Sequence, residues 1–447
     1  MQEYPTPLPA ATQILVQVGW RNTCGAPPPL TSPASTSRTG WELSHLFPNP
    51  ISRVLSCSQI LFPYPVPIFY SHVLFQYPIP ISCSHILFRS PFPSPDPLFS
   101  FLFHESSTMS VPFRQLLQEH PTNHARFTGR RTGTDKDWAK RYEPISKLSV
   151  HTYVSPGQNG AERVTVADWD TALLPPMLDD QLRLGVSGER PNRRRHRLDS
   201  ESDMALWFHT EVSNVVLAAW NQHPMVLQTC ETKSGQHPAD LEVVDVVYSH
   251  EFGNNKHPLL VGEFNRNLID RGEWQAGVCR SQQSKVLSRE LRGYAHKYGC
   301  TQVFCFDGQT MLLLQFRAAV LDAVREKDCV VDCWVIPRIN AGGCTMREAL
   351  YRLLVQGFRR CQGLCAVPGL TVAGHAPHRE LFSGRPVFDD GTGSLSYEHP
   401  RNGGDGGFDR EVEPNDGSVY WRYNGQPYTE NGILVRDTFP MWAAPEN

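Results

Sequence analysis

Three stretches of the chain place apolar residues every three or four positions, the spacing that gathers them on one face of a helix. They are residues Ser200–Trp220, Gln282–Cys300 and Gly342–Gly363. In the first, Ser200 is followed three residues later by Asp203, and in the third Thr345 and Glu348 have the same spacing. Both pairs match the pattern of a helix capping box. We therefore expect three long amphipathic helices.

Between these helices, apolar residues alternate with others or form short Val-rich runs, which predicts β-strands. The runs are residues 242–252, 258–266, 301–306, 310–318 and 329–338. The third and fourth runs flank Asp307-Gly308, a dipeptide typical of hairpin turns. The order helix, strand, strand, helix, strand predicts an α/β (α+β) fold with a central mixed sheet flanked by helices.

Residue composition divides the chain into four regions. Residues 1–108 are rich in Pro, Ser and Phe, and we expect them to be disordered because frequent prolines interrupt helices and sheets. An ordinary start follows at Met109, so this region is better interpreted as translated pyrimidine-rich sequence than as a functional segment. We expect residues 109–199 to form a mostly irregular basic linker, 200–382 the folded domain and 383–447 a Gly- and Asp-rich tail.

Charge and cysteine content restrict the class of protein. The 447 residues carry a formal net charge of −3, so contact with nucleic acid would depend on local basic patches. The 12 cysteines are too scattered for a disulfide scaffold, which favours an intracellular protein. We find no signal peptide and no apolar run of about 18 residues, and therefore expect no membrane segment.

A basic run, Gly188–Arg197, contains five arginines in ten residues. Such a run is typical of a solvated linker. Its Arg190–Arg197 part would also suit a signal for import into the nucleus or an arm that contacts phosphates. The sequence leaves these alternatives open.

Two of the predicted strands carry an acid within an apolar run, Asp245 in the first and Glu263 in the second. An isolated carboxylate in such surroundings costs several kcal/mol unless something neutralises it. Neighbouring antiparallel strands could bring both acids to one point, where Mg²⁺ would be the usual neutralising ion. The sequence therefore predicts a Mg²⁺ site with Asp245 and Glu263 as ligands.

The flanking helices supply further candidates. Glu211 lies near the apolar face of the first helix and could be a third metal ligand, although acids at the flank of a helix usually reach water. Four basic residues form one stripe along the second helix: Lys285, Arg289, Arg292 and His296. A basic stripe is commonly a solvated face, but after an acid-bearing strand it would also suit nucleic-acid phosphates.

The helix with Glu211, the strand with Asp245 and the Glu263-x-Asn265 motif together resemble the core of the PD-(D/E)XK superfamily, the restriction-endonuclease-like proteins. The resemblance spans residues 200–318 and implies a Mg²⁺-dependent nuclease whose three acids surround the metal. The segments LSRELRGYAHKYG, VFCFDG, LLLQFRA and ALYRLLVQGFRRCQG also resemble a group of uncharacterised fungal proteins.

The sequence departs from this superfamily at Asn265, which stands where the motif has lysine. An amide can orient water but supplies no positive charge. Lys285 or Arg289 could supply the charge from the second helix. Alternatively, catalysis has been lost and the chain is a non-catalytic nucleic-acid or protein-binding module on the same fold.

A structural zinc site is a further alternative. Its ligands would be two Cys-x3-Cys pairs, Cys329, Cys333, Cys361 and Cys365. That spacing is looser than in common zinc ribbons, and the first pair lies in a predicted strand, so we disfavour zinc.

Overall fold

The structure is a computed structural model that describes residues 110–442 with gaps. The gaps are residues 122, 124, 128, 130, 132, 134–135, 158–161, 234–242, 340–341, 367–376, 390–391, 393–394 and 402–406. The N-terminal extension, which we expect to be disordered, lies outside the described residues.

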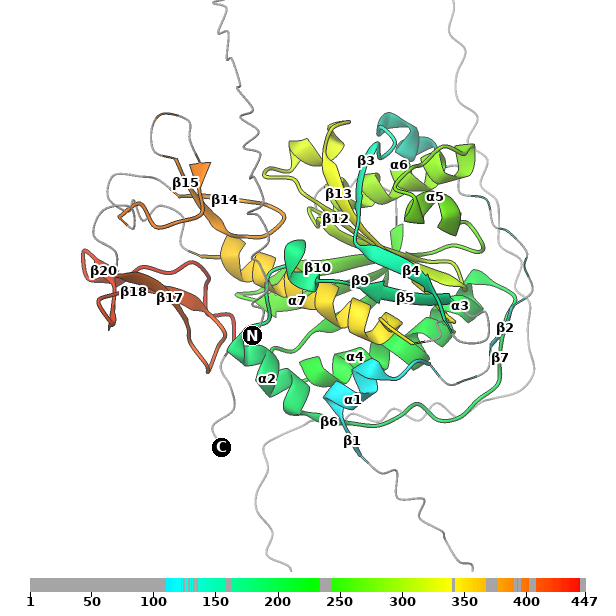
Figure 1. Ribbon diagram of the computed structural model, residues 1–447, viewed down its shortest axis with the longest axis horizontal. Coiled ribbons are helices and arrows are strands. Elements are labelled where there is room, and N and C mark those ends of the chain that lie inside the picture. The colour runs from blue at the N-terminus through cyan, green and yellow to red at the C-terminus, as the bar shows by residue number, and fades with distance from the viewer. Residues whose placement is uncertain are drawn as a thin grey trace, which may run out of the picture. The chain divides into compact units, whose positions relative to one another are not determined.

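A seven-stranded mixed sheet lies at the centre of the described part of the chain (Figure 1). In spatial order its strands are β3 (Lys147–Val150), β13 (Val330–Pro337), β12 (Thr310–Phe316), β11 (Gln302–Phe306), β10 (Asn255–Phe264), β9 (Val243–Phe252) and β8 (Leu227–Lys233). β10 pairs with β11, and β13 with β3, in parallel, whereas the other neighbours are antiparallel. The prediction of a central mixed sheet is confirmed, although the sequence pattern does not predict β8 or β3.

Helices cover both faces of this sheet. On one face lie α7 (Met346–Leu364) and α3 (Glu201–Phe208), and α3 continues through a π-helical turn (His209–Ser213) into α4 (Asn214–Leu217). The buried apolar side chains of these helices pack against the sheet together with α1 (Phe113–Gln118). This layer forms the larger of the two cores.

The opposite face carries α6 (Gln282–Lys297) and the short α5 (Arg271–Gln275). Leu287 and Leu291 of α6 pack against strand residues such as Val261, forming a second core. The sheet is therefore the middle layer of three, and its two faces bury different helices.

The local signals in the sequence are confirmed where they are strongest. The Ser200 hydroxyl accepts a hydrogen bond from the backbone N of Asp203 at 3.0 Å, and the Thr345 hydroxyl accepts one from Glu348 at the same distance. The hairpin between β11 and β12 turns at Gly308, whose φ of 90° favours glycine.

Residues 110–199 differ from the linker that we expect. Besides α1 and β3, they contain α2 (Leu178–Gly185) and the short elements β1 (Val111–Pro112), β2 (Ala125–Phe127), η1 (Asp137–Arg141), β4 (Thr152–Pro156), β5 (Glu162–Val166), η3 (Trp169–Thr171), β6 (Ser187–Gly188) and β7 (His196–Leu198). Phe113 and Leu116 are fully buried, and Arg183 of α2 is buried as well. This region therefore belongs to the folded core, because long-range contacts stabilise elements too short to show a periodic pattern.

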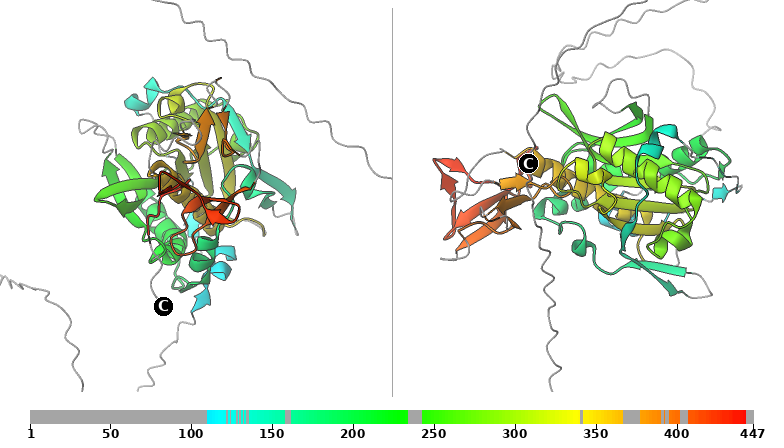
Figure 2. Two further views of the ribbon diagram at one scale, coloured as in Figure 1. Left: turned by 90° about the vertical axis from the view of Figure 1, so that its left-hand side faces the viewer. Right: turned by 90° about the horizontal axis from the view of Figure 1, so that it is seen from above.

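The C-terminal region also forms short strands (orange to red in Figures 1 and 2). They are β14 (Pro377–Arg379), β15 (Pro386–Asp389), β16 (Leu395–Ser396), β17 (Phe408–Val412), β18 (Val419–Tyr423), β19 (Gln426–Pro427), β20 (Thr429–Glu430) and β21 (Ile433–Leu434). Phe408 and Trp421 are buried in a small cluster of their own. Arg359 and Gln362 of α7 donate hydrogen bonds to the carbonyls of Gly417 and Asp416, so this region is attached to the core.

Within the described residues, none of the helices has the length and apolar character needed to cross a lipid bilayer.

Candidate functional site

The two strand acids lie side by side. β9 and β10 pair antiparallel with Val247 opposite Val261 and Val246 opposite Gly262, so the continuing register places Asp245 opposite Glu263. The backbone N of Phe264 donates to Asp245 Oδ2 at 2.6 Å, which fixes the start of β9 to the end of β10. Both acids point to the sheet face that α6 covers, because they alternate with Val246 and Phe264, which belong to the opposite core.

A third acid and a cation complete this acid site. Lys136, just before η1, places its Nζ 2.8 Å from Glu263 Oε1 and 2.5 Å from Glu290 Oε1. It also donates to the Tyr294 hydroxyl at 2.6 Å. Glu290 and Tyr294 project from α6, where Glu290 is fully buried. The sequence signal for Glu290 is an acid on the apolar face of a helix, whereas Lys136 lies in a loop without a pattern.

Burial and like charge raise the pKa values of these acids. The pKa of Asp245 is raised to about 6, mainly by burial and also by the nearby Glu201 and Glu290. Burial and the charges of Asp245 and Glu290 raise the pKa of Glu263 well above its ordinary value. Burial alone would lower the pKa of Lys136, but its attraction to Glu263 and Glu290 raises it. The acid site is therefore short of positive charge even with Lys136 in place.

Glu263 keeps one carboxylate oxygen without a partner. Its Oε2 is buried and makes no hydrogen bond with the described residues, while Asp245 beside it is partly exposed. A buried, unpaired carboxylate oxygen beside a second acid fits a divalent cation, and Mg²⁺ commonly uses one or two carboxylates and completes its shell with water. No group of three or more His, Cys, Asp or Glu side chains in the described part of the chain is arranged to hold a metal. The two strand acids would therefore be the protein ligands.

Lys136 begins a strap, residues Lys136–Ile145, that crosses the outer side of α6. Trp138 lies so close to Gly293 that a Cβ there would approach its ring to 2.3 Å. The Lys297 ammonium lies 4.4 Å from the centre of the same ring, and Ile145 N donates to Ser288 Oγ at 3.2 Å. These contacts fix the strap along α6, and the fixed strap places Lys136 next to the acids.

The structure does not bring Glu211 to the acid site. Glu211 lies in the π-helical turn on the opposite face of the sheet, fully buried, and accepts a hydrogen bond from Asn123 Nδ2. Arg347 Nε donates to its backbone carbonyl at 2.7 Å. The acid of the first helix whose charge helps to raise the pKa of Asp245 is Glu201, in the first turn of α3.

The four side chains of the predicted basic stripe of α6 do not form one exposed surface. Arg292 is buried and donates to the carbonyls of Arg325 (3.2 Å), the last residue of η6 (Asp322–Arg325), and of Glu326 just after it. His296 Nδ1 forms a hydrogen bond with the Tyr142 hydroxyl at 3.2 Å. Both side chains therefore stabilise the packing of neighbouring segments and are not available to bind nucleic-acid phosphates.

The other two residues of the stripe, Lys285 and Arg289, are half-buried. Among the described residues the cation that contacts Glu263 is Lys136, and no contact of Lys285 or Arg289 with the acids is found. Asn265 follows the end of β10, buried, with its Nδ2 unpaired within the described part of the chain. The positive charge next to Glu263 therefore comes from Lys136 of the strap, and not from the two helix residues that the sequence suggests.

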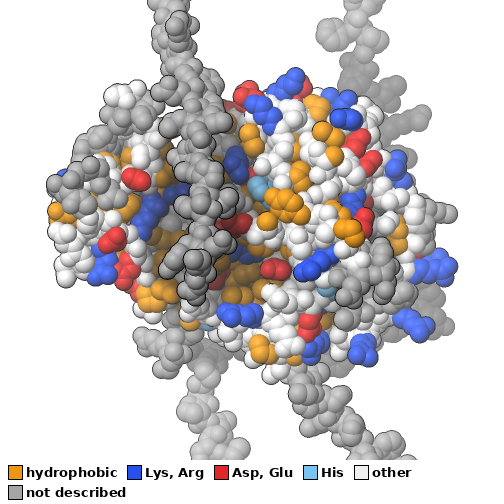
Figure 3. Space-filling model, in the orientation of Figure 1, with side chains coloured by type: hydrophobic (Ala, Val, Ile, Leu, Met, Phe, Trp, Pro, Cys, Tyr) orange, Lys and Arg blue, Asp and Glu red, His pale blue; other side chains and the backbone are white. Residues whose placement is uncertain are grey.

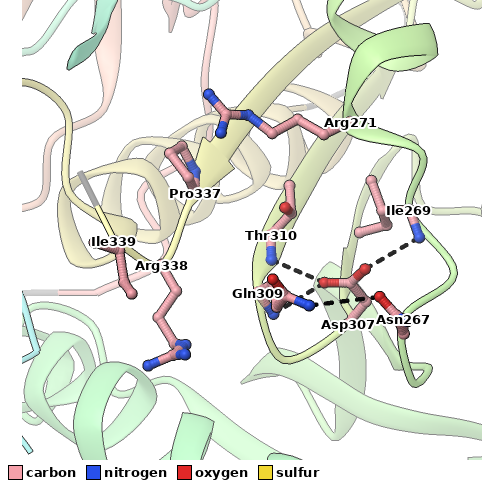
Figure 4. Close-up of a pocket in the computed structure, with 9 residues that line it drawn as sticks. All are labelled: Asn267, Ile269, Arg271, Asp307, Gln309, Thr310, Pro337, Arg338 and Ile339. Atoms are coloured by element: carbon pink, nitrogen blue, oxygen red, sulfur yellow. Dashed lines mark hydrogen bonds between the residues drawn. The ribbon is translucent and has the colours of Figure 1, made fainter. Parts of the chain in front are cut away.

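A pocket of about 250 Å³ opens beyond the ends of β10 and β11 (Figure 4). The Asp307 carboxylate in this pocket accepts hydrogen bonds from the backbone N of Ile269 (3.1 Å), Gln309 (3.0 Å) and Thr310 (2.8 Å), two of which Figure 4 shows as dashed lines. Both carboxylate oxygens of Asp307 already accept hydrogen bonds from these backbone N–H groups. Asp307 therefore stabilises the hairpin and is no candidate metal ligand.

The four cysteines considered for zinc lie on different faces of the sheet. Cys329 and Cys333 belong to the core beneath α6, whereas Cys361 and Cys365 of the α7 end pack in the opposite core. The two pairs therefore cannot form one site.

Comparison with protein-family models, curated proteins and solved structures gives no match for this chain. Any assignment of function consequently depends on the chemistry of the acid site.

Proposed function

We propose that this chain is a Mg²⁺-dependent nuclease that hydrolyses phosphodiester bonds, with Asp245 and Glu263 as metal ligands and Lys136 as the catalytic cation. The observation that carries the proposal is the meeting of two adjacent strand acids with a lysine ammonium 2.8 Å from Glu263. Asn265 leaves the motif without its positive charge, and Lys136 supplies that charge from the strap.

The order of elements supports the resemblance to the PD-(D/E)XK superfamily. The helix α3 is followed by the antiparallel strands β8, β9 and β10, then by α6, and then by β11 parallel to β10. This order sets the Asp strand beside the Glu strand and follows them with a helix, as the motif requires. Glu201 would take the place of the first-helix acid.

The chemistry follows from the charges at the site. Mg²⁺ bound by Asp245 and Glu263 would polarise the scissile phosphate and stabilise the leaving oxygen. Glu263 would use its unpaired Oε2 for this purpose, while its Oε1 retains Lys136. The Lys136 side chain is 35% exposed, and its ammonium would stabilise the negative charge that develops on the phosphate as water attacks. Glu290 and Tyr294 would hold that ammonium in position.

The experiment is a cleavage assay on single- and double-stranded DNA and RNA with and without Mg²⁺. We expect Asp245→Asn, Glu263→Gln and Lys136→Ala each to reduce cleavage by about 100-fold or more, because each removes charge that is used in the transition state. Glu251→Gln is the matched control, since Glu251 is an exposed acid at the far end of β9. Absence of cleavage by the unmodified chain on all four substrates would refute the proposal.

A non-catalytic nucleic-acid-binding module is the second candidate function. It is favoured by the ion pairs of Lys136 with both Glu263 and Glu290, which partly neutralise the acids without a metal. Calorimetric titration with Mg²⁺ separates the two functions. A nuclease should bind Mg²⁺ and lose that binding in Glu263→Gln, whereas a structural ion-pair cluster should give no binding heat.

A further inference from the structure

Five exposed arginines lie on a small two-stranded ribbon next to α3. The ribbon is the parallel pair β2 and β7 with the residues that lead into β7, and the arginines are Arg126, Arg193, Arg194, Arg195 and Arg197. We call this set the arginine ribbon. Figure 1 places β2 and β7 along the right-hand edge, and Figure 3, in the same orientation, shows Lys and Arg side chains along that edge.

The ribbon places like charges side by side. Arg126 is directly opposite Arg197 in the register of β2 and β7, and like charges in that position repel. Arg197 is paired with Asp199, but the ion pairs of the described residues do not include Arg126, Arg193 or Arg194. Arg195 is equally without an ion pair in that part of the chain. A row of guanidinium groups of which four make no ion pair with the described residues is suited to a polyanion.

The backbone of the ribbon is fixed rather than loose. Asn123, which is 6% exposed, donates to the carbonyl of Asn192 at 3.0 Å and accepts from the backbone N of Arg194 at 2.7 Å. Asn123 also donates to the buried Glu211, whose Oε1 lies 3.9 Å from His196 Nε2 in β7. Glu211 therefore anchors the arginine ribbon, which gives this buried acid a role distinct from metal binding.

The ribbon leads directly to the acid site. β7 ends two residues before Ser200, the cap of α3, and Glu201 in the first turn of α3 lies close enough to act on the charge of Asp245. On the other strand, Gly129 accepts a hydrogen bond from Asn267 Nδ2 at 3.4 Å, three residues beyond the end of β10. The chain then continues to Lys136. The carboxyl ends of both ribbon strands thus lead toward the end of the sheet that carries Glu263.

We propose that the arginine ribbon binds the sugar-phosphate backbone of the nucleic acid and presents it to the acid site, an inference that rests on the proposed nuclease function. The row of guanidinium groups would contact successive phosphates, and the substrate strand would continue past the start of α3 toward Asp245. The acids themselves repel phosphate, so a separate positively charged surface beside them is needed to hold the substrate.

The experiment measures binding apart from cleavage, with the full chain in EDTA and fluorescent DNA and RNA oligonucleotides at several salt concentrations. We expect the triple variant Arg193→Ala, Arg194→Ala, Arg195→Ala to bind at least about tenfold more weakly at moderate salt. The magnitude of the slope of log affinity against log salt should fall by about two to three, because a protein that makes three fewer phosphate contacts releases fewer counterions on binding. All three side chains are exposed, so the thermal unfolding temperature should stay unchanged.

The matched control is Lys147→Ala, Lys256→Ala, Lys327→Ala, which removes the same charge from exposed sites off the ribbon. Binding by this control should stay within about twofold of the unmodified chain, and a charge-preserving Arg-to-Lys triple should retain most of it. Equal weakening by both alanine triples, or no weakening by the ribbon triple, would overturn the proposal. So would binding to vesicles of anionic phospholipid with none to oligonucleotides.

A parallel assay with Mg²⁺ separates this proposal from the function on which it rests. If the ribbon triple loses binding and no form of the chain cleaves, the ribbon is supported and the nuclease function is refuted. If the chain cleaves and the ribbon triple cleaves with an unchanged KM, the ribbon is overturned and the nuclease function is supported.

Discussion

Glu263 has opposing neighbours: one carboxylate oxygen contacts an ammonium, and the other is buried without a partner in the described part of the chain. Removing a bare carboxylate from water is costly, so the folded state favours the protonated forms of Glu263 and Asp245. Cation binding and proton binding therefore compete at this pair of acids.

This competition gives a prediction for the pH dependence of Mg²⁺ binding. Because the pKa of Asp245 is about 6, the affinity for Mg²⁺ should increase between pH 5 and 7 as its proton is lost. Calorimetry at several pH values should detect the gain and the release of protons on binding. Glu251→Gln should behave like the unmodified chain. An affinity that is constant over this range would show that Asp245 does not bind the metal.

The raised pKa of Asp245 also contributes to the pH dependence of folding stability. A carboxyl whose pKa is raised in the folded state holds a proton that the unfolded state has already lost, so stability falls as pH rises from about 4 to about 6. In Asp245→Asn the amide cannot titrate, and urea unfolding across this pH range should show a shallower decline. A decline as steep as in the unmodified chain would assign it to other groups.

The sequence predicts the part of the acid site whose residues lie in regular strands, and not the part that lies in a loop. Asp245 and Glu263 stand out as acids in apolar strands, and strand pairing alone brings them together. Lys136 has no comparable signal, because a loop lysine 127 residues from Glu263 is placed only by the packing of the strap. Glu211 was misleading for a related reason: helical spacing shows that it lies near a buried face but not which face of the sheet that helix covers.

At the scale of elements, the strap and α6 act as one unit. Gly293 leaves the space that Trp138 fills, and Trp138 follows Lys136 by two residues. The close approach is possible only without a side chain at position 293. The placement of Lys136 therefore depends on a glycine in a different element.

Gly293→Ala tests this dependence. Alanine stabilises a helix by up to about 1 kcal/mol relative to glycine, so α6 should remain folded while the added methyl group displaces Trp138. Lys136 should then leave its ion pairs and react several-fold faster with an amine-labelling reagent, as read by mass spectrometry. Trp138→Phe added to Gly293→Ala should restore protection, because the smaller ring leaves room for the methyl group. Unchanged labelling of Lys136 in the single variant would contradict the role of the strap.

The elements that the sequence predicts are those with long periodic patterns. The helices α3, α6 and α7 carry caps and apolar faces, and β9 to β13 are apolar runs. β8, by contrast, is an edge strand with the mixed sequence LQTCETK, and the elements of residues 110–199 are mostly two to eight residues long. These elements are stabilised by contacts with residues that are distant in the sequence, and they have no local pattern that would predict them.

At the scale of the whole molecule, residues 110–199 are attached to the core by a buried charge network. Arg183 of α2 contacts Asp179 and Asp180 at 2.7 Å each, and Arg359 of α7 contacts the same two acids. Tyr351 of α7 donates to Asp180 at 2.7 Å. Breaking one such buried pair costs about 3–5 kcal/mol because it leaves a charge without a partner.

A chain that begins at residue 200, the start suggested by the sequence pattern, should therefore not fold. It would leave Arg359 without its acids, remove β3 from the sheet and lose Phe113 and Leu116 from the cores. A chain that begins at Ser110, the first described residue, keeps all of these contacts. We expect the longer chain to unfold cooperatively in urea and to resist limited proteolysis, and the shorter one to aggregate or be digested. Cooperative unfolding of the 200–447 chain would show that the network contributes little, because the remaining sheet and helices would then form a sufficient core alone.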